Sequence, residues 1–214
     1  MKKFGFTLAE VLITLVIIGI IASITIPALM NNTNDEENIA AYKKALSVMN
    51  QALRTEYALE GNTAVYTEQP IPGSPEYAKN WKGLAAIMAK RANIVKYDIE
   101  PYGNHIKAIS SSGTRARIFA PADGMIFAIP TPRDTYTSCP LDGPPERDGW
   151  YPVQCGHGIV DVNGKKGPNK LAQMNGGKIT KIGDTFKFSI HDIGVLPGII
   201  QDSTEARLVY GKRK

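Results

Sequence analysis

The pattern of hydrophobic and polar positions changes twice along the chain, and each stretch predicts a different kind of element. Residues 11–30 are almost continuously apolar. Residues 39–57 place apolar side chains at spacings of three and four, which is the period of a helix with one buried face. From residue 94 onward the apolar residues occur in short runs separated by turn residues, which is typical of strands. The pattern therefore predicts a long N-terminal helix followed by a sheet.

The first apolar run is long enough to cross a membrane. About twenty residues at ~1.5 Å each span ~30 Å, the thickness of the hydrocarbon core of a bilayer. Lys2 and Lys3 precede the run, and basic flanking residues stay in the cytoplasm, so the rest of the chain is expected outside the cytoplasmic membrane. No convincing A-x-A cleavage site follows, and the run continues through Pro27 into a helical pattern. We therefore expect the segment to be retained.

Glu10 is the unusual residue of this segment, because it places a carboxylate among apolar side chains. Such a group costs on the order of 2.5–3.5 kcal/mol at mid-bilayer, less near the interface, and usually has a partner. If the chain were cut after Gly5, the new α-amino group of Phe6 would lie about one helical turn from Glu10. A charge pair between neighbouring subunits would then become possible.

These residues, Gly5-Phe6-Thr7-Leu8-Ala9-Glu10 followed by the apolar run, resemble the processing signal of type IV pilins and of the pseudopilins of type II secretion. The resemblance implies that a prepilin peptidase cuts between Gly5 and Phe6 and that Phe6 is then N-methylated. It also implies that Glu10 pairs with the amino terminus of an adjacent subunit during assembly. A plain signal anchor, with Glu10 at the interface by accident, is the alternative.

The expected organisation has four parts. Residues 1–5 form a leader peptide, residues 6–30 the transmembrane and assembly half of a long helix, and residues 31–60 its amphipathic half. Residues 61–214 form a globular head with a variable loop and a C-terminal sheet. The predicted fold class is α+β and pilin-like, with the long helix packed on an antiparallel sheet. Within the helix, the stretch from Gly19 to Pro27 is expected to be weak, giving a kink, local melting or simple bending.

Two helical faces are predicted to belong to the core of the head. The amphipathic half of the long helix presents an apolar stripe made of Ile39, Tyr42, Leu46, Met49, Leu53 and Tyr57. A second helix is predicted to begin with Ser74 as N-cap and Pro75 at its first position, and to end near Ala92. Its apolar face consists of Tyr77, Trp81, Leu84, Ala85 and Met88.

Short alternating runs predict the strands. They cover residues 106–109, 116–119 and 125–129, and the Asp-Gly pair at 123–124 predicts that the last two form a hairpin. Residues 157–164 follow the cysteine loop and lead into a turn-rich stretch. In residues 184–190, Phe186, Phe188 and Ile190 are expected to face one way. Residues 206–210 are expected to form a possible last strand.

Cys139 and Cys155 lie outside the membrane in the expected topology, where disulfides persist. A bridge between them closes a loop of about fifteen residues and contributes ~3 kcal/mol in the chain-entropy model. The enclosed sequence is rich in Pro and Gly, so we expect the disulfide. A zinc site made of both cysteines and His157 is the alternative, but it lacks an obvious fourth ligand and a paired C-x-x-C spacing.

Asp161, Asn163 and Asp184 bear oxygens of the kind that calcium prefers. However, Lys165 and Lys166 stand where further oxygen ligands would help, and the acids do not alternate as in an EF-hand loop. We therefore expect turns fixed by side-chain hydrogen bonds, with calcium as the open alternative. No bound metal and no cofactor are expected.

Composition and motifs argue against an enzyme. The 214-residue chain has a formal charge of +5, and loss of Lys2 and Lys3 leaves about +3 on its side chains, with a basic C-terminus at residues 212–214. The sequence contains neither a Gly-rich phosphate loop nor a G-x-S-x-G nucleophile motif. The three histidines, His105, His157 and His191, are scattered. We expect a non-enzymatic protein, and nucleic acid is not an expected partner.

The sequence thus predicts a structural subunit of a type IV pilus-like filament or a type II secretion pseudopilus. The expected partners are copies of itself, other pilin-like subunits, a prepilin peptidase, an inner-membrane assembly platform and the membrane. The expected location is the bacterial inner membrane, crossed once with the head in the periplasm, and then an extracytoplasmic filament. One alternative is a minor filament-tip subunit that binds DNA or a surface, and another is a signal-anchored periplasmic enzyme.

Overall fold

The computed structural model describes residues 5, 7–65, 81–97, 116–130, 139–141, 154–164, 166–167, 169–175, 178–198 and 203–211. The chain divides into two compact units, which we call the anchor unit (Met1–Glu37) and the head unit (Asn38–Lys214). Each is described by itself below. The α+β fold class predicted from the sequence is confirmed by a long apolar N-terminal helix and a C-terminal antiparallel sheet.

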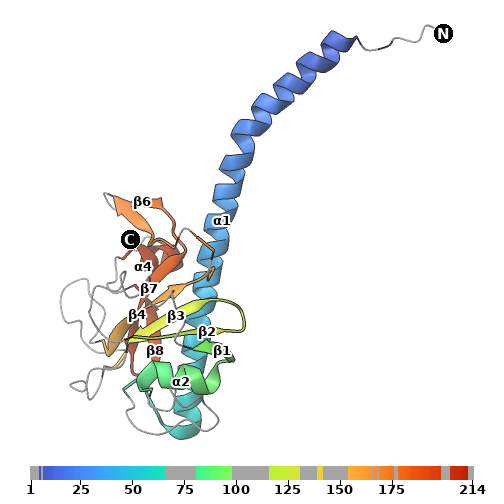
Figure 1. The fold of residues 1–214 in the computed structure, drawn as a ribbon. Helices are drawn as coiled ribbons and strands as arrows, with labels where there is room; N and C mark the ends of the chain where they lie inside the picture. The colour runs from blue at the N-terminus through green and yellow to red at the C-terminus, as the bar shows by residue number, and fades with distance from the viewer. Residues whose placement is uncertain are drawn as a thin grey trace. The chain divides into compact units, whose positions relative to one another are not determined.

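Helix α1 (Leu8–Glu60) accounts for 53 residues and confirms the predicted long helix (Figure 1). Pro27 lies inside it, and the residues from Gly19 to Pro27 all remain helical, so local melting is not observed. The helix ends where Gly61 adopts a positive φ of 71° and its N–H bonds to the carbonyl of Tyr57 at 2.9 Å. Glycine is suited to this position because a Cβ atom strains a left-handed backbone.

Within the head unit, α1 buries most of the predicted apolar stripe. Tyr42, Met49 and Leu53 are fully buried, and Leu46 is nearly so. Tyr57, however, is 51% exposed, so its predicted core position is wrong. The helix has turned far enough by this point that the adjacent Glu56 faces inward instead.

Glu56 is a buried carboxylate that ties α1 to the second helix. Its oxygens accept hydrogen bonds from Lys90 at 3.0 Å, from Arg91 at 2.6 Å and from Asn62 at 2.9 Å. Burial raises the pKa of Glu56, but these donors outweigh it and hold the pKa below its ordinary value. Lys90 and Arg91 also pair with Glu60.

The second helix, α2 (Gly83–Arg91), is shorter than predicted. Trp81 lies just before its first residue rather than within it, although it is 2% exposed and belongs to the core as expected. Leu84, Ala85 and Met88 are also buried. The predicted start of the helix at Ser74 and Pro75, like Tyr77, falls outside the described residues.

Six antiparallel strands form the main sheet in the order β1-β2-β3-β4-β7-β8, and β5 and β6 form a separate pair. The strands are β1 (Ile94–Tyr97), β2 (Ala116–Pro121), β3 (Ile126–Pro130), β4 (Gly156–Asp161), β5 (Gln173–Asn175), β6 (Lys178–Lys181), β7 (Thr185–His191) and β8 (Gly194–Pro197). The β2–β3 register, Phe119 opposite Phe127, confirms the hairpin predicted from the Asp-Gly turn. The strand predicted at 106–109 lies outside the described residues.

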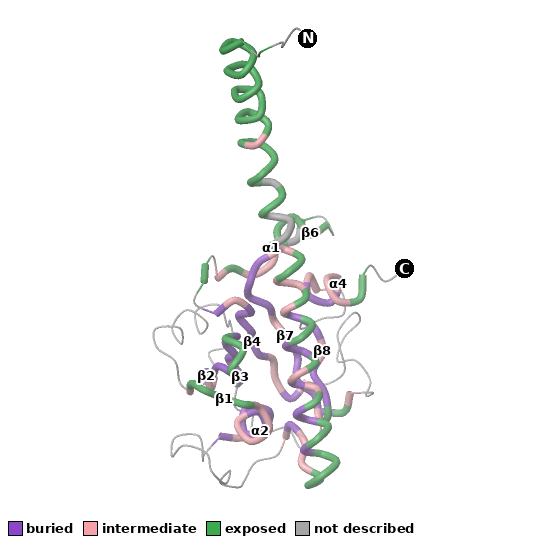
Figure 2. Tube along the Cα trace, turned by 90° about the vertical axis from the view of Figure 1, so that its right-hand side faces the viewer, coloured by how far each residue is buried: buried purple, intermediate pink, exposed green. Residues whose placement is uncertain are grey.

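The main core of the head lies between α1 and this sheet, and Figure 2 colours its buried residues purple together with the other buried residues of the head. Tyr42 stacks on Phe186 with ring centroids 4.5 Å apart, and Phe119 stacks on Phe127 at 5.6 Å. Phe186, Phe188 and Ile190 of β7 all enter this core, as their alternation predicts. Aromatic residues dominate such cores because each removes a large apolar area from water.

The C-terminal segment is a helix, not the predicted strand. Helix α4 (Thr204–Tyr210) begins at Ser203, whose Oγ accepts a hydrogen bond from the N–H of Ala206 at 3.1 Å. The carboxylate of Glu205, nearly buried, accepts a hydrogen bond from the N–H of Lys187 on β7 at 3.2 Å. The N-cap and this contact with the sheet favour the helix over the weak strand pattern of residues 206–210.

Candidate functional site

The predicted processing junction lies at the exposed start of the anchor unit. Gly5 is exposed, and α1 begins three residues later at Leu8. A Cβ atom added to Gly5 would meet nothing within 4 Å. Phe6, the predicted new N-terminal residue, falls outside the described residues. The chain's own structure therefore places no requirement for glycine at position 5.

Glu10 and Thr7 together cap α1. The carboxylate of Glu10 accepts a hydrogen bond from the N–H of Thr7 at 2.8 Å and another from its hydroxyl at 2.9 Å, while the N–H of Glu10 donates to Thr7 Oγ1 at 3.3 Å. This reciprocal arrangement is a capping box, which satisfies backbone donors at a helix start. Our sequence reasoning missed it, although the T-x-x-E spacing of Thr7 and Glu10 was the signal.

The part of α1 that could span a membrane runs from Leu8 to Pro27, and none of it is buried. Glu10 is the one charged residue in this stretch. The hydroxyls of Thr14, Ser23 and Thr25 donate to carbonyls one turn back, at 2.8–2.9 Å. These bonds satisfy the polar groups within the helix itself, so Glu10 is left as the residue with the strongest need for a partner in lipid.

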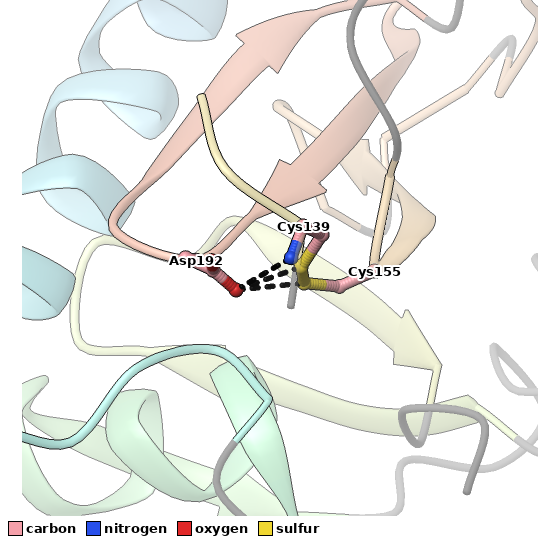
Figure 3. Close-up of side chains that lie close together, drawn as sticks. All are labelled: Cys139, Cys155 and Asp192. Atoms are coloured by element: carbon pink, nitrogen blue, oxygen red, sulfur yellow. Dashed lines mark hydrogen bonds between the residues drawn. A yellow bond between two sulfur atoms is a disulfide. The ribbon is translucent and has the colours of Figure 1, made fainter. Parts of the chain in front are cut away.

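Cys139 and Cys155 form the predicted disulfide, with Cα atoms 5.5 Å apart. The carboxylate Oδ1 of Asp192 lies 2.9 Å from Sγ of Cys139 and 3.7 Å from Sγ of Cys155, and it accepts a hydrogen bond from the N–H of Cys139 (Figure 3). Asp192, rather than the predicted His157, is thus the ionisable residue beside the two sulfurs. The disulfide closes the cysteine loop, and two hydrogen bonds between Cys139 and Asp192 hold this end of the loop against the β7–β8 turn, which is a structural role.

The second polar cluster contains the three oxygen-bearing residues singled out from the sequence, and the structure brings them together. Asp184 is buried and accepts hydrogen bonds from the N–H groups of Asn169 at 2.7 Å and Lys170 at 2.6 Å, and from Asn163 Nδ2 at 3.1 Å. These bonds join residues 14 to 21 positions apart, so they are tertiary contacts and not the local Asx-turn bonds expected from the sequence. Both carboxylate oxygens of Asp161 and the amide oxygen of Asn163 are also buried, and no donor among the described residues meets hydrogen-bond geometry with them.

Burial and the neighbouring Asp184 carboxylate raise the pKa of Asp161 to about 7, although the nearby N–H groups of Asn163 and Gly164 favour its charged form. A proton on Asp161 is therefore one way to stabilise the cluster. An oxygen-preferring cation such as calcium is the other, because the unpaired oxygens of Asp161 and Asn163 are of the type that it binds.

We expect the free energy of unfolding of the head to fall as the pH rises, when a chelator removes divalent cations. Because the pKa of Asp161 is raised from 3.8 to about 7, its protonated form contributes stability fully below pH 4, and this is lost as pH rises through 7. The loss is on the order of 4 kcal/mol. Thermal unfolding of full-length protein in detergent and chelator should show this slope, and Asp161→Asn should reduce it. If the unfolding free energy of the wild type depends on pH as little as that of the variant, the raised pKa of Asp161 is contradicted.

If a cation replaces the proton, added calcium raises the wild-type Tm at pH 8 but not that of Asp161→Asn.

These features define a class: an α+β protein with a span-length N-terminal helix, one acid near its start and a glycine–phenylalanine junction before it. The prokaryotic N-terminal methylation motif matches residues 1–26. The type II secretion system core protein G of Escherichia coli (strain K12) is 33% identical over 103 residues, which cover 48% of this chain and 69% of that protein. No solved structure matches. The chain belongs to the family of type IV pilins and type II secretion pseudopilins, whose members are structural subunits rather than a known class of enzyme.

Proposed function

We propose that this protein is a membrane-stored structural subunit of a type II secretion pseudopilus or a type IV pilus-like filament. A prepilin peptidase cuts it between Gly5 and Phe6, Phe6 is methylated, and an inner-membrane platform adds the subunit to a filament of copies of itself and other pilin-like chains. The observation that carries the proposal is the single acid, Glu10, in an exposed apolar helix that the methylation motif matches almost entirely.

In this mechanism, the charge pair between Glu10 and the α-amino group of a neighbouring Phe6 sets the register between adjacent helices. Cutting after Gly5 removes Lys2 and Lys3 and creates an α-amino group at Phe6. In an apolar surrounding, a carboxylate and an ammonium group attract strongly only when each lacks a better partner. Glu10 of a subunit already in the membrane is such a partner for the amine of its neighbour. The pair therefore sets how far one helix slides past the next.

Apolar burial alone does not drive this assembly. The exposed side chains of the anchor unit, such as Ile13, Leu15 and Ile18, already contact lipid tails in the stored state, and lipid is as apolar as a neighbouring helix. Packing between helices and the pair at Glu10 must supply the difference. Because the contacts are head-to-tail and do not close, they continue into an open filament.

The proposed topology follows from charge. Lys2 and Lys3 remain in the cytoplasm, Leu8–Pro27 crosses the inner membrane, and the head unit lies in the periplasm. A disulfide between Cys139 and Cys155 is consistent with that oxidising compartment.

The mass of the native N-terminus tests the proposal. We expect the protein isolated from its own cell membrane to begin at Phe6 and to carry one methyl group on the α-nitrogen, measured by mass spectrometry of its N-terminal peptide. The same chain made in cells that lack a prepilin peptidase should begin at Met1. A native chain that begins at Met1 when the peptidase is present contradicts the proposed processing.

A further inference from the structure

A small lysine-rich hairpin emerges from the head between Lys170 and Asp184. Within the described part of the chain, strands β5 (Gln173–Asn175) and β6 (Lys178–Lys181) pair only with each other. On β6, Ile179 is half-buried while the other three residues are exposed. Two paired strands with so little burial gain little from packing. The hairpin therefore contributes little to the core.

The segment that contains the hairpin carries only positive charge. Residues 162–183 contain five lysines and no acidic residue. Four of these lysines are in the described part of the chain, and all four are exposed: Lys166, Lys170, Lys178 and Lys181. Among the described residues, none of the four pairs with a carboxylate. We call these four residues the lysine cluster.

The base of the hairpin is fixed at one end of the head. The carbonyl of Lys170 accepts hydrogen bonds from the N–H groups of Asp184 at 3.1 Å and Thr185 at 3.2 Å, so the hairpin leaves directly from the start of β7. Just beyond this start, the carbonyl of Lys187 accepts a hydrogen bond from the hydroxyl of Tyr42 at 2.7 Å. Tyr42 is only four residues from Asn38, the first residue of the head unit.

The two views agree with this placement. Figures 1 and 2 both show β6 and α4 at the end of the head unit where α1 enters it, and both show β1 and α2 at the opposite end. Tyr210, at the end of α4, is 52% exposed. Tyrosine is enriched at the level of lipid headgroups.

The connection between this end of the head and the apolar span is short. The span ends at Pro27 and the head unit begins at Asn38. The residues between them add ~15 Å if helical and at most ~40 Å if fully extended, whatever the angle between the two units. Chain length alone therefore tethers the end of the head that carries the lysine cluster within ~40 Å of the end of the span.

We propose that the lysine cluster docks on anionic phospholipid headgroups while the unassembled subunit is stored in the membrane. This inference rests on the proposed membrane anchoring. Lipid phosphates are the favoured partner because the tether holds them at high local concentration. Each lysine near an anionic surface contributes about a fivefold increase in occupancy, so several together hold the head in one orientation. Extraction into a filament must break these contacts.

The test uses the full-length chain in lipid vesicles. A fluorophore is placed on the hairpin at Asn175→Cys, with Val95→Cys on exposed β1 as the control position. Nitroxide-labelled headgroups serve as quencher in vesicles of phosphatidylcholine, with or without phosphatidylglycerol. We expect stronger quenching at position 175 with phosphatidylglycerol, lost between about 0.1 M and about 1 M salt because screening shortens from ~10 Å to ~3 Å. Position 95 should show neither effect.

Charge variants provide the second arm. Lys178→Gln combined with Lys181→Gln should lower the docked fraction by about 25-fold relative to the undocked one. Arg54→Gln combined with Lys96→Gln removes the same charge from exposed positions outside the cluster and should leave quenching unchanged. Equal quenching with and without phosphatidylglycerol overturns the proposal, because the tether alone would then explain it. Lysine-dependent binding of DNA, without any effect of anionic lipid, would also overturn the proposal.

Failure of the anchoring itself is measured separately. Carbonate extraction of the same vesicles shows whether the chain is an integral membrane protein. An integral chain whose hairpin ignores anionic lipid contradicts the docking inference alone. A chain that carbonate removes contradicts both the docking and the proposed anchoring.

Discussion

Glu10→Gln is expected to insert into the membrane as the wild-type chain does and to lower filament formation at least ~10-fold, which corresponds to ~1.4 kcal/mol per subunit contact. Glutamine keeps the shape of the side chain and its ability to accept hydrogen bonds from Thr7, but it removes the negative charge. The amine of the incoming Phe6 then has no counter-charge in an apolar surrounding. The amount of sheared filament, relative to total membrane-bound subunit, measures the effect.

The capping box makes the choice of substitution important. Glu10 accepts two hydrogen bonds from Thr7, so Glu10→Ala removes the charge together with the carboxylate half of the capping box. The N–H of residue 10 still donates to Thr7 Oγ1 in that variant. Glutamine is tolerated at this position of a capping box, so Glu10→Gln separates the two effects.

Thr7→Ala is the reciprocal control. It removes the capping hydroxyl but keeps the carboxylate of Glu10, so we expect it to assemble far better than Glu10→Gln. Glu37→Ala, which removes an exposed acid from the same unit, should assemble normally. If Glu10→Gln formed filaments at the wild-type level, the charge pair would not contribute to assembly. Equal defects in Glu10→Gln and Thr7→Ala would assign the effect to the helix start instead.

Gly5→Val is expected to block processing and to leave the full-length chain in the membrane without filaments. The physical reason lies in the peptidase rather than in this chain, because the space around Gly5 is open and a side chain there would strike nothing within 4 Å. Folding and insertion should therefore be unchanged, while a branched side chain next to the cut bond obstructs the enzyme. The retained leader also keeps Lys2 and Lys3 on the cytoplasmic side and denies the neighbour its amine.

Gly19→Ala provides the matched control for Gly5→Val. The space around Gly19 is also open, and its substitution lies inside α1, away from the junction. Processing should proceed normally in this variant, as followed by the size and N-terminal mass of the membrane-bound chain. Filaments from uncut Gly5→Val would show that leader removal is not required, and cutting of Gly5→Val at the wild-type rate would remove glycine from the recognition signal.

Local signals were sufficient where one segment decides its own structure. The apolar run, its single acid and the stripe from Tyr42 to Leu53 predict α1 because helix periodicity and bilayer length depend on nearby residues alone. The Asp-Gly turn predicts the β2–β3 hairpin for the same reason, since a tight turn fixes its own register.

Predictions failed where distant residues compete for a segment. Residues 206–210 look like a strand by composition, yet Ser203 caps a helix there and Glu205 bonds to the backbone of Lys187. Tyr57 was assigned to the core, but the basic end of α2 draws Glu56 inward and leaves Tyr57 exposed. The cap at Ser203 is local, but the bonds of Glu205 and Glu56 join residues 18 to 35 positions apart, and spacing along the chain does not predict those.

The sequence by itself therefore determined the membrane-length helix, the processing signal and the place of the acid, because these depend on contiguous residues. Tertiary structure alone decided which carboxylates are buried, that Asp161 lies beside Asp184 with no donor bonded to it among the described residues, and that a lysine hairpin emerges at the helix-entry end of the head. Those features arise when segments far apart in the chain meet, and the cost of burying a charge depends on what it meets there.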